Sequence, residues 1–119
     1  MLNRLKSLLE EFELPVYYGR TTHNTDDDWN YIIFNKRGLK KSGTSKVDFN
    51  YYYQVHIIQE DYIPEGFELE VIKKITDNTR LRLSDSEMEY NYTVKNNTNM
   101  VIEMLTIEFT LSKKGDCNG

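Results

Sequence analysis

The sequence has one cysteine, two prolines and no long apolar run, and each scarcity excludes a class of protein. With Cys117 alone, one chain forms neither a disulfide framework nor a cysteine-based metal site. Pro15 and Pro64 are too few for a proline-rich linker. No stretch approaches the roughly 20 apolar residues of a membrane span, and Glu10 and Glu11 interrupt the N-terminal segment where a secretory signal needs an apolar core. We therefore expect an intracellular protein without a membrane anchor.

An excess of basic residues is also absent. The 15 Lys and Arg are outnumbered by 19 Asp and Glu, which gives a formal net charge of -4 at pH 7. Because a DNA-binding protein normally presents a basic stripe, specific binding to nucleic acid is not expected. Aromatic residues are plentiful at 13%, and most of them are Tyr, which favours strands over helices. The chain length predicts a single domain over residues 1–119, with 113–119 as a flexible tail.

Two segments carry apolar residues at helical spacing. Apolar side chains from Leu2 to Phe12 recur every three or four positions, which predicts a helix over residues 2–13 that ends before Pro15. A second helix is predicted over residues 64–78, because proline suits the first helical position. Strands are predicted where apolar and polar residues alternate, at 16–18, 29–35, 47–59, 80–83, 89–94 and 100–112. The order α-β-β-β-α-β-β-β predicts an α+β domain, with two helices packed on one face of a mostly antiparallel sheet.

The segment 36–46, KRGLKKSGTSK, is locally basic and rich in glycine and serine. It is predicted to be a long hairpin loop between the strands 29–35 and 47–59. Loops longer than hairpin packing requires often contact a partner. The candidate contact residues in this segment are Arg37, Lys40, Lys41 and Lys46.

Candidates for catalysis are few. Three adjacent carboxylates, Asp26, Asp27 and Asp28, precede Trp29, but a calcium loop needs carboxylates at alternate positions. The sequence contains no nucleophile elbow, no phosphate loop and no H-E-x-x-H motif. An alternative places one Mn or Zn ion between Asp26, Asp28 and His23. We expect a solvated turn instead, and neither catalytic, metal nor cofactor residues.

The strand 100–112 gives the clearest sign of association between subunits. Glu103 falls in its core-facing register, where a carboxylate must meet a cation or a Tyr hydroxyl, or lie where the core ends. A bulge near Glu103 is the alternative. Met100, Ile102 and Met104 make the other face apolar as well, and Tyr52 lies on the matching face of the strand 47–59. In so small a chain, the layer that covers this second apolar face is most naturally another subunit.

Two strand patterns suggest a family. They are Y-x-V-x-I-I-x-E-D, from Tyr53 to Asp61, and V-I-E-M-L-x-I-E-F, from Val101 to Phe109. With the short N-terminal helix and the aspartate-rich turn before an aromatic strand, this layout resembles the small tail-terminator or tail-completion proteins of long-tailed bacteriophages of Gram-positive hosts. The resemblance spans nearly the whole chain. The abundance of Asn, Lys, Ile and Tyr fits an AT-rich genome.

The resemblance implies a virion structural protein without enzymatic activity. Such proteins form a hexameric ring that caps the tail tube and joins it to the head connector, with DNA passing through the lumen without specific binding. The chain would be made in the host cytoplasm and reside at the head–tail interface. Alternatives are a head-completion or connector subunit, a minor capsid protein, a small metal-dependent hydrolase, or a regulatory or immunity-type binding module. The predicted interface residues are Asp26, Asp27, Asp28, Trp29, Arg37, Lys40, Lys41, Lys46, Tyr52, Met100, Ile102 and Met104, with Glu103 as a buried polar residue.

Overall fold

The computed structural model describes residues 1–20, 29–42, 48–95 and 98–114. Its α+β architecture and the order of its elements are as predicted. The elements are α1 (Leu2–Glu10), β1 (Val16–Tyr18), β2 (Tyr31–Ser42), β3 (Asp48–Glu60), α2 (Phe67–Asn78), β4 (Arg82–Leu83), β5 (Tyr90–Val94) and β6 (Val101–Lys114).

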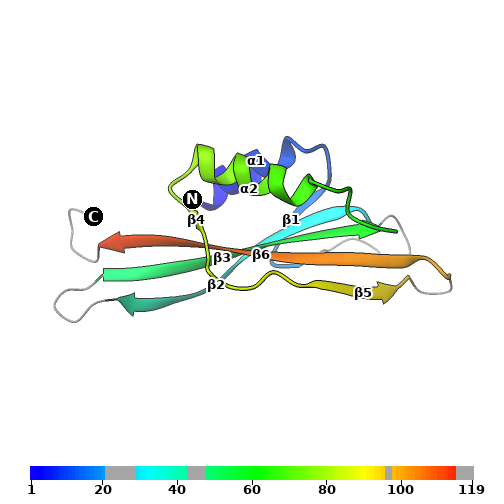
Figure 1. Ribbon diagram of the computed structural model, residues 1–119. Coiled ribbons are helices and arrows are strands. Elements are labelled where there is room, and N and C mark those ends of the chain that lie inside the picture. The colour runs from blue at the N-terminus through cyan, green and yellow to red at the C-terminus, as the bar shows by residue number, and fades with distance from the viewer. Residues whose placement is uncertain (21–28, 43–47, 96–97, 115–119) are drawn as a thin grey trace.

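All the strands belong to one sheet, and both helices lie over the same face of it (Figure 1). The strand order is β1-β2-β3-β6-β4, and β5 also pairs with β6. The long strands β2, β3 and β6 are antiparallel, whereas β1 runs parallel to β2. Because β4 pairs with Phe109 and Thr110 and β5 pairs with residues 101–105, these two short strands follow one another along the same edge of β6.

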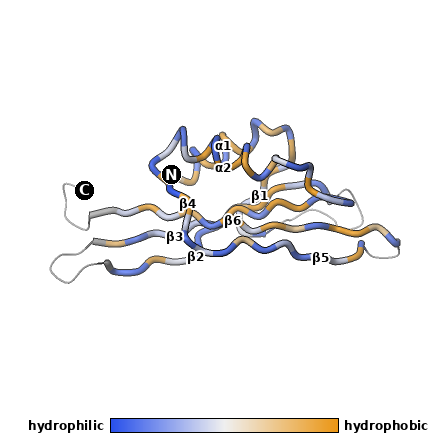
Figure 2. The backbone as a smooth tube through the Cα atoms, in the orientation of Figure 1, coloured by the Kyte–Doolittle hydropathy of each residue, from blue (hydrophilic) through white to orange (hydrophobic). Residues whose placement is uncertain are grey.

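The hydrophobic core lies between the helices and the sheet, and hydrophobic positions are spread over both layers (Figure 2). The alternation of β3 and β6 turns every second residue toward the helices. Fully buried members of this core are Leu5, Leu9, Ile32, Val55, Ile57, Val71, Ile75, Ile107 and Phe109. Because burying one large aliphatic side chain contributes about 1.5–3 kcal/mol, this layer is the main source of stability.

The sheet is longer than the helix layer that covers it (Figure 1). The molecule extends 55 Å along its long axis but only 27 and 25 Å across it. At one end, three strands continue together beyond the helices, comprising Gly38–Ser42, Asp48–Tyr52 and Thr110–Lys114. We call this part the distal extension.

Most of the segment 36–46 is strand, so the prediction of a long loop there is wrong. Strand β2 continues to Ser42, and residues 43–47, with Lys46, lie outside the described part. The register with β3 shifts between Lys36 and Gly38, so Arg37 is an extra, bulged residue. Since β3 is equally long, its backbone can pair with the whole of β2, and lysines are tolerated on a strand that lies at an edge.

Both helices are shorter than predicted. Helix α1 ends at Glu10, and Glu13 has a φ of 63° where the chain turns before Pro15. Helix α2 begins at Phe67 rather than at Pro64. Gly66 precedes it with a φ of 88°, a left-handed conformation that glycine adopts without steric cost and that does not continue into a helix.

Candidate functional site

The helix-free face of the sheet carries a second apolar cluster. Tyr31, Ile58 and Ile102 form its buried centre. Partly buried residues pack around them, namely Tyr17, Trp29, Ile33, Met100 and Met104. Ile102 is 0% exposed within one chain, so its burial does not require a second subunit. Trp29 packs in the same cluster on the helix-free face, together with Met100 and Met104. Both faces of this part of the sheet are therefore apolar, as predicted.

A row of polar side chains crosses the middle of the same face. The His56 Nε2–H donates to Asn35 Oδ1 over 2.6 Å, and the Thr106 hydroxyl donates to His56 Nδ1 over 2.8 Å. Asn35 Nδ2 in turn donates to Gln54 Oε1 over 3.1 Å. Burial lowers the pKa of His56, which keeps its imidazole neutral near pH 7. Both ring nitrogens of His56 are thus occupied by side chains of its own sheet, which gives this residue a structural role.

The bulged residue Arg37 turns toward the helix-free face. Its Nε lies 2.9 Å from Glu108 Oε1, and its guanidinium carbon lies 4.4 Å from the centre of the Tyr52 ring. Such a partly exposed pair contributes up to about 1 kcal/mol. The sequence predicted that Arg37 and Tyr52 contact a partner, and in the single chain they contact each other.

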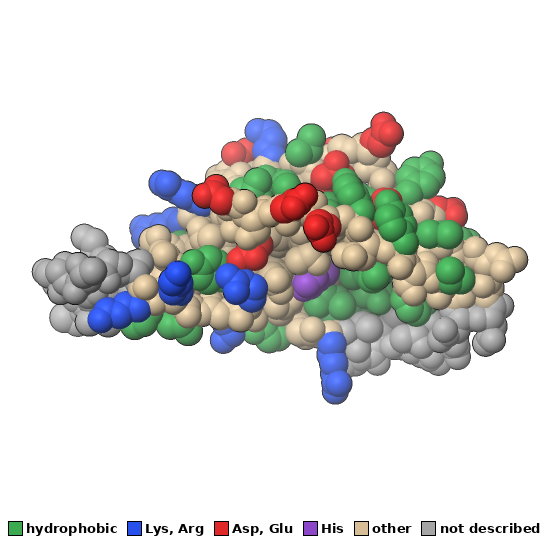
Figure 3. Space-filling model, turned by 60° about the horizontal axis from the view of Figure 1, so that its bottom comes forward, with side chains coloured by type: hydrophobic (Ala, Val, Ile, Leu, Met, Phe, Trp, Pro, Cys, Tyr) green, Lys and Arg blue, Asp and Glu red, His purple; other side chains and the backbone are tan. Residues whose placement is uncertain are grey.

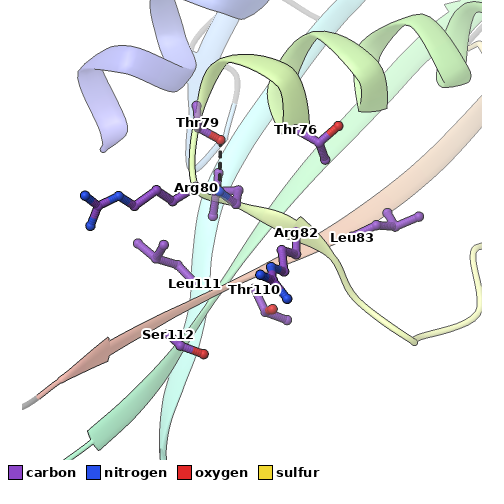
Figure 4. A pocket seen from close by; sticks show the side chains of 9 residues that line it. Thr76, Thr79, Arg80, Arg82, Leu83, Thr110, Leu111 and Ser112 are labelled. Carbon is purple, nitrogen blue, oxygen red and sulfur yellow. Dashed lines mark hydrogen bonds between the residues drawn. The ribbon is translucent and has the colours of Figure 1, made fainter.

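A basic hollow of about 770 Å³ opens between the end of α2, strand β4 and the distal extension. Arg82 extends across it toward Thr110, whereas Arg80 points away (Figure 4). Hydroxyls of Thr76, Thr110 and Ser112 complete its lining. The last turn of α2 also lies there, and its carbonyl groups form the negative end of the helix dipole. That end disfavours a bound anion, so arginine and hydroxyl groups alone do not make a phosphate site here.

An acidic, tyrosine-rich hollow of about 320 Å³ lies toward the opposite end of the sheet. Its polar lining, which we call the tyrosine–glutamate rim, consists of Tyr62, Glu65, Glu68, Tyr90, Tyr92 and Glu103. Among the described residues, none of its three carboxylates forms an ion pair, and Lys95 pairs with Glu60 at 3.2 Å. Carboxylates and aromatic rings together favour a cationic partner.

Glu103 belongs to this rim and lies on the helix side of β6. Its Oε1 accepts the backbone N–H of Ile63 over 2.7 Å, and the Tyr92 hydroxyl donates to the same carboxylate. That hydrogen bond raises the pKa of Tyr92. Glu103 is half-buried rather than buried, because the core ends there. The register of β6 is continuous past this residue, so the alternative of a bulge at Glu103 is wrong.

Strand β5 forms an exposed edge, a position that its sequence alone does not indicate. All five of its residues are exposed, and Tyr92 is 61% exposed. Within the described ranges β5 pairs with β6 alone, so its other edge has no strand beside it. The alternating sequence signals a strand but not its place at an edge, because strand order depends on distant pairing.

The remaining predicted residues fall into two groups. Lys40 and Lys41 are exposed on β2. Asp26, Asp27, Asp28 and Lys46 lie outside the described residues, as does His23 of the alternative metal site. Across the described ranges, no three His, Cys, Asp or Glu side chains gather in a way that could hold a metal ion.

Two further findings concern the class of protein to which the chain could belong. Neither helix in the described part is long and apolar enough to cross a membrane. Comparison with protein-family models and with curated proteins finds no match to either.

Proposed function

We propose that this chain is a virion assembly subunit, a tail terminator that forms a ring, caps the tail tube and joins it to the head connector. The observation that carries the proposal is the distal extension, in which three strands project beyond the helices. Leu39 is 57% exposed there, and Phe49 and Tyr51 remain only partly buried on the helix side.

An uncovered extension of this kind is costly for a monomer. Its helix side exposes apolar surface, and covering Leu39 alone would contribute about 1 kcal/mol. Strands with apolar residues on a face gain most when a second layer or a second chain covers them. A neighbouring subunit that covers the apolar helix side of the distal extension would supply this layer, which supports a function in assembly.

The tail-specific part of the proposal rests on the resemblance in layout to tail-terminator proteins. Charge supports it. The net charge of -4 disfavours sticking to DNA that passes through a ring, because phosphates and carboxylates repel each other. On the helix-free face, Glu108 offsets the charge of Arg37 and His56 is neutral, and Lys40 and Arg82 also lie on that face.

The test is assembly of the full chain, alone and on tail tubes built from the tail tube protein of the same genome. Native mass spectrometry should detect a closed ring, with six copies expected, and electron microscopy should show it at the tube end. Added chain should also stop tube growth. A chain that stays monomeric at high concentration and leaves tubes uncapped and growing contradicts the proposal.

A further inference from the structure

Two of the free edge segments in the described part of the sheet lie on opposite sides of it. One is the outer edge of β5 (Tyr90–Val94), beside which no strand lies in the described part of the chain. The other is the outer edge of β2 beyond β1. Strand β1 covers β2 only as far as Phe34, where Gly19 N–H donates to the Phe34 carbonyl over 2.9 Å. From Arg37 to Ser42, the outer edge of β2 has no described strand beside it.

The two edges differ in how they are protected. Natural proteins usually shorten, charge or cover a free edge, because its unpaired N–H and C=O groups attract other strands. Strand β2 carries Lys40 and Lys41 at its free end, which oppose pairing with another β2. Strand β5, with the sequence YNYTV, carries no charge at all and is fully exposed. Its composition is that of a strand that is covered by a partner.

The side chains that flank the two edges are complementary in charge. On the helix side, β5 is bordered by the tyrosine–glutamate rim, whose carboxylates have no ion-pair partner in the described residues. On the helix side of β2 lie Leu39 and Lys41, since they pair with Tyr51 and Phe49. Lysine and arginine side chains gather toward the distal extension and hydrophobic side chains toward the opposite end (Figure 3).

We infer that the free edge of β2 (Arg37–Ser42) in one copy adds as a strand to β5 of the next copy. This inference rests on the proposed ring and names its contact. Lys41 then lies against Glu65 and Glu68, while Leu39 covers Tyr90 and Tyr92. The addition satisfies the backbone groups of both edges and gives the most exposed residues of each edge an apolar or charged partner.

A head-to-tail contact of this kind also allows a ring. Each copy offers one β2 edge and one β5 edge, so the contact is head-to-tail and repeats until it closes or grows into a filament. Rotation about a ring axis keeps the helices of every copy on the same side of the joined sheet. Leu39 and Lys41 of one copy therefore lie on the same side of the joined sheet as the tyrosine–glutamate rim of the next copy.

A charge exchange tests the contact. Lys41→Glu, and separately Glu65→Lys with Glu68→Lys, should each weaken association of the chain about tenfold or more, measured by analytical ultracentrifugation. An equimolar mixture of the two variants should restore it, because every contact then pairs opposite charges. Matched controls are Lys40→Glu, on the other face of β2, and Glu70→Lys, exposed on α2 outside the rim. These controls should change association less than threefold, and thermal melts should show that every variant folds.

Disulfide trapping gives a second readout. In a Cys117→Ser background, Leu39→Cys and Tyr92→Cys chains should cross-link to each other on mild oxidation and not to themselves. Self-linked Tyr92→Cys dimers would show a symmetric β5 contact and overturn the inference. Rings that form normally without the charge effect or the mixed cross-link would also overturn it, while leaving the proposed function intact. A chain that neither self-associates nor caps tubes overturns both.

Discussion

Replacing Glu103 with Ala should destabilise the fold by about 2 kcal/mol. Its carboxylate accepts the Ile63 backbone N–H over 2.7 Å, and the Ile63 side chain is itself buried. A hydrogen bond to a charged group contributes about 1.5–3 kcal/mol, and an unsatisfied buried donor costs about 1–3 kcal/mol. We take a value in the lower half of both ranges, because Glu103 is half-buried and water can reach part of it.

Chemical denaturation of wild type and variant measures this cost directly. For a domain of this size, the loss corresponds to a fall of roughly 8 °C in Tm. Glu103→Gln keeps an acceptor oxygen and should lose only about 1 kcal/mol. Tyr92→Phe removes the other hydrogen bond of the carboxylate and leaves the Ile63 contact intact, so it serves as the control and should melt close to wild type.

The same variants report on the tyrosine. Because the carboxylate of Glu103 raises the pKa of Tyr92, Glu103→Gln should lower that pKa toward the ordinary value of about 10. Tyrosine ring-carbon NMR during an alkaline titration resolves the shift. The reasoning fails if Glu103→Ala unfolds within about 0.5 kcal/mol of wild type, since the Ile63 N–H would then not depend on the carboxylate.

Three further predictions follow from other parts of the sheet and its turns. Because the pKa of His56 is lowered in the folded chain, the unfolded chain binds a proton at this residue first as the pH falls. The free energy of unfolding should therefore fall below about pH 6.5, by at most about 1.4 kcal/mol per pH unit. In His56→Gln, this part of the slope should disappear from denaturation curves measured between pH 7 and 5. Ile102→Ala should cost about 2–5 kcal/mol in denaturant even under monomeric conditions, because Ile102 is buried within one chain, and a loss seen only on association would contradict this. Gly66→Ala should cost about 1–2 kcal/mol through its φ of 88°, although a Cβ there meets no atom within 4 Å; an unchanged Tm would show that the turn relaxes.

The sequence was sufficient to predict the fold because its signals are local. The period of two in 49–57 and 101–111 places Val55, Ile57, Ile107 and Phe109 on the helix side, where the structure buries them. The same period identifies Glu103 as an exception among the apolar residues of its strand. Helical spacing likewise predicts both helices, because an amphipathic helix reveals its buried face without reference to any partner.

What the sequence did not predict depends on distant pairing. Gly38 and the lysines around it are typical of a loop, and only the matching length of β3 extends β2 to Ser42. The exposure of β5 follows from its place beside β6, which its own alternation cannot reveal. The tyrosine–glutamate rim joins residues from the segment after β3, from α2, from β5 and from β6, so no short motif marks it.

The bulge at Arg37 reverses the rule that assigns side chains of β2 to a face. Before it, odd-numbered residues such as Ile33 and Asn35 point to the helix-free face; after it, odd-numbered Leu39 and Lys41 point to the helix side. Deleting Arg37 would therefore restore a regular ladder in which Leu39 still lies opposite Tyr51 and Lys40 opposite Asn50, so both side chains would keep their faces. The bulge thus accommodates one extra residue while Leu39 stays on the helix side and Lys40 on the helix-free face, so loss of Arg37 would remove the ion pair with Glu108 without turning the distal extension over.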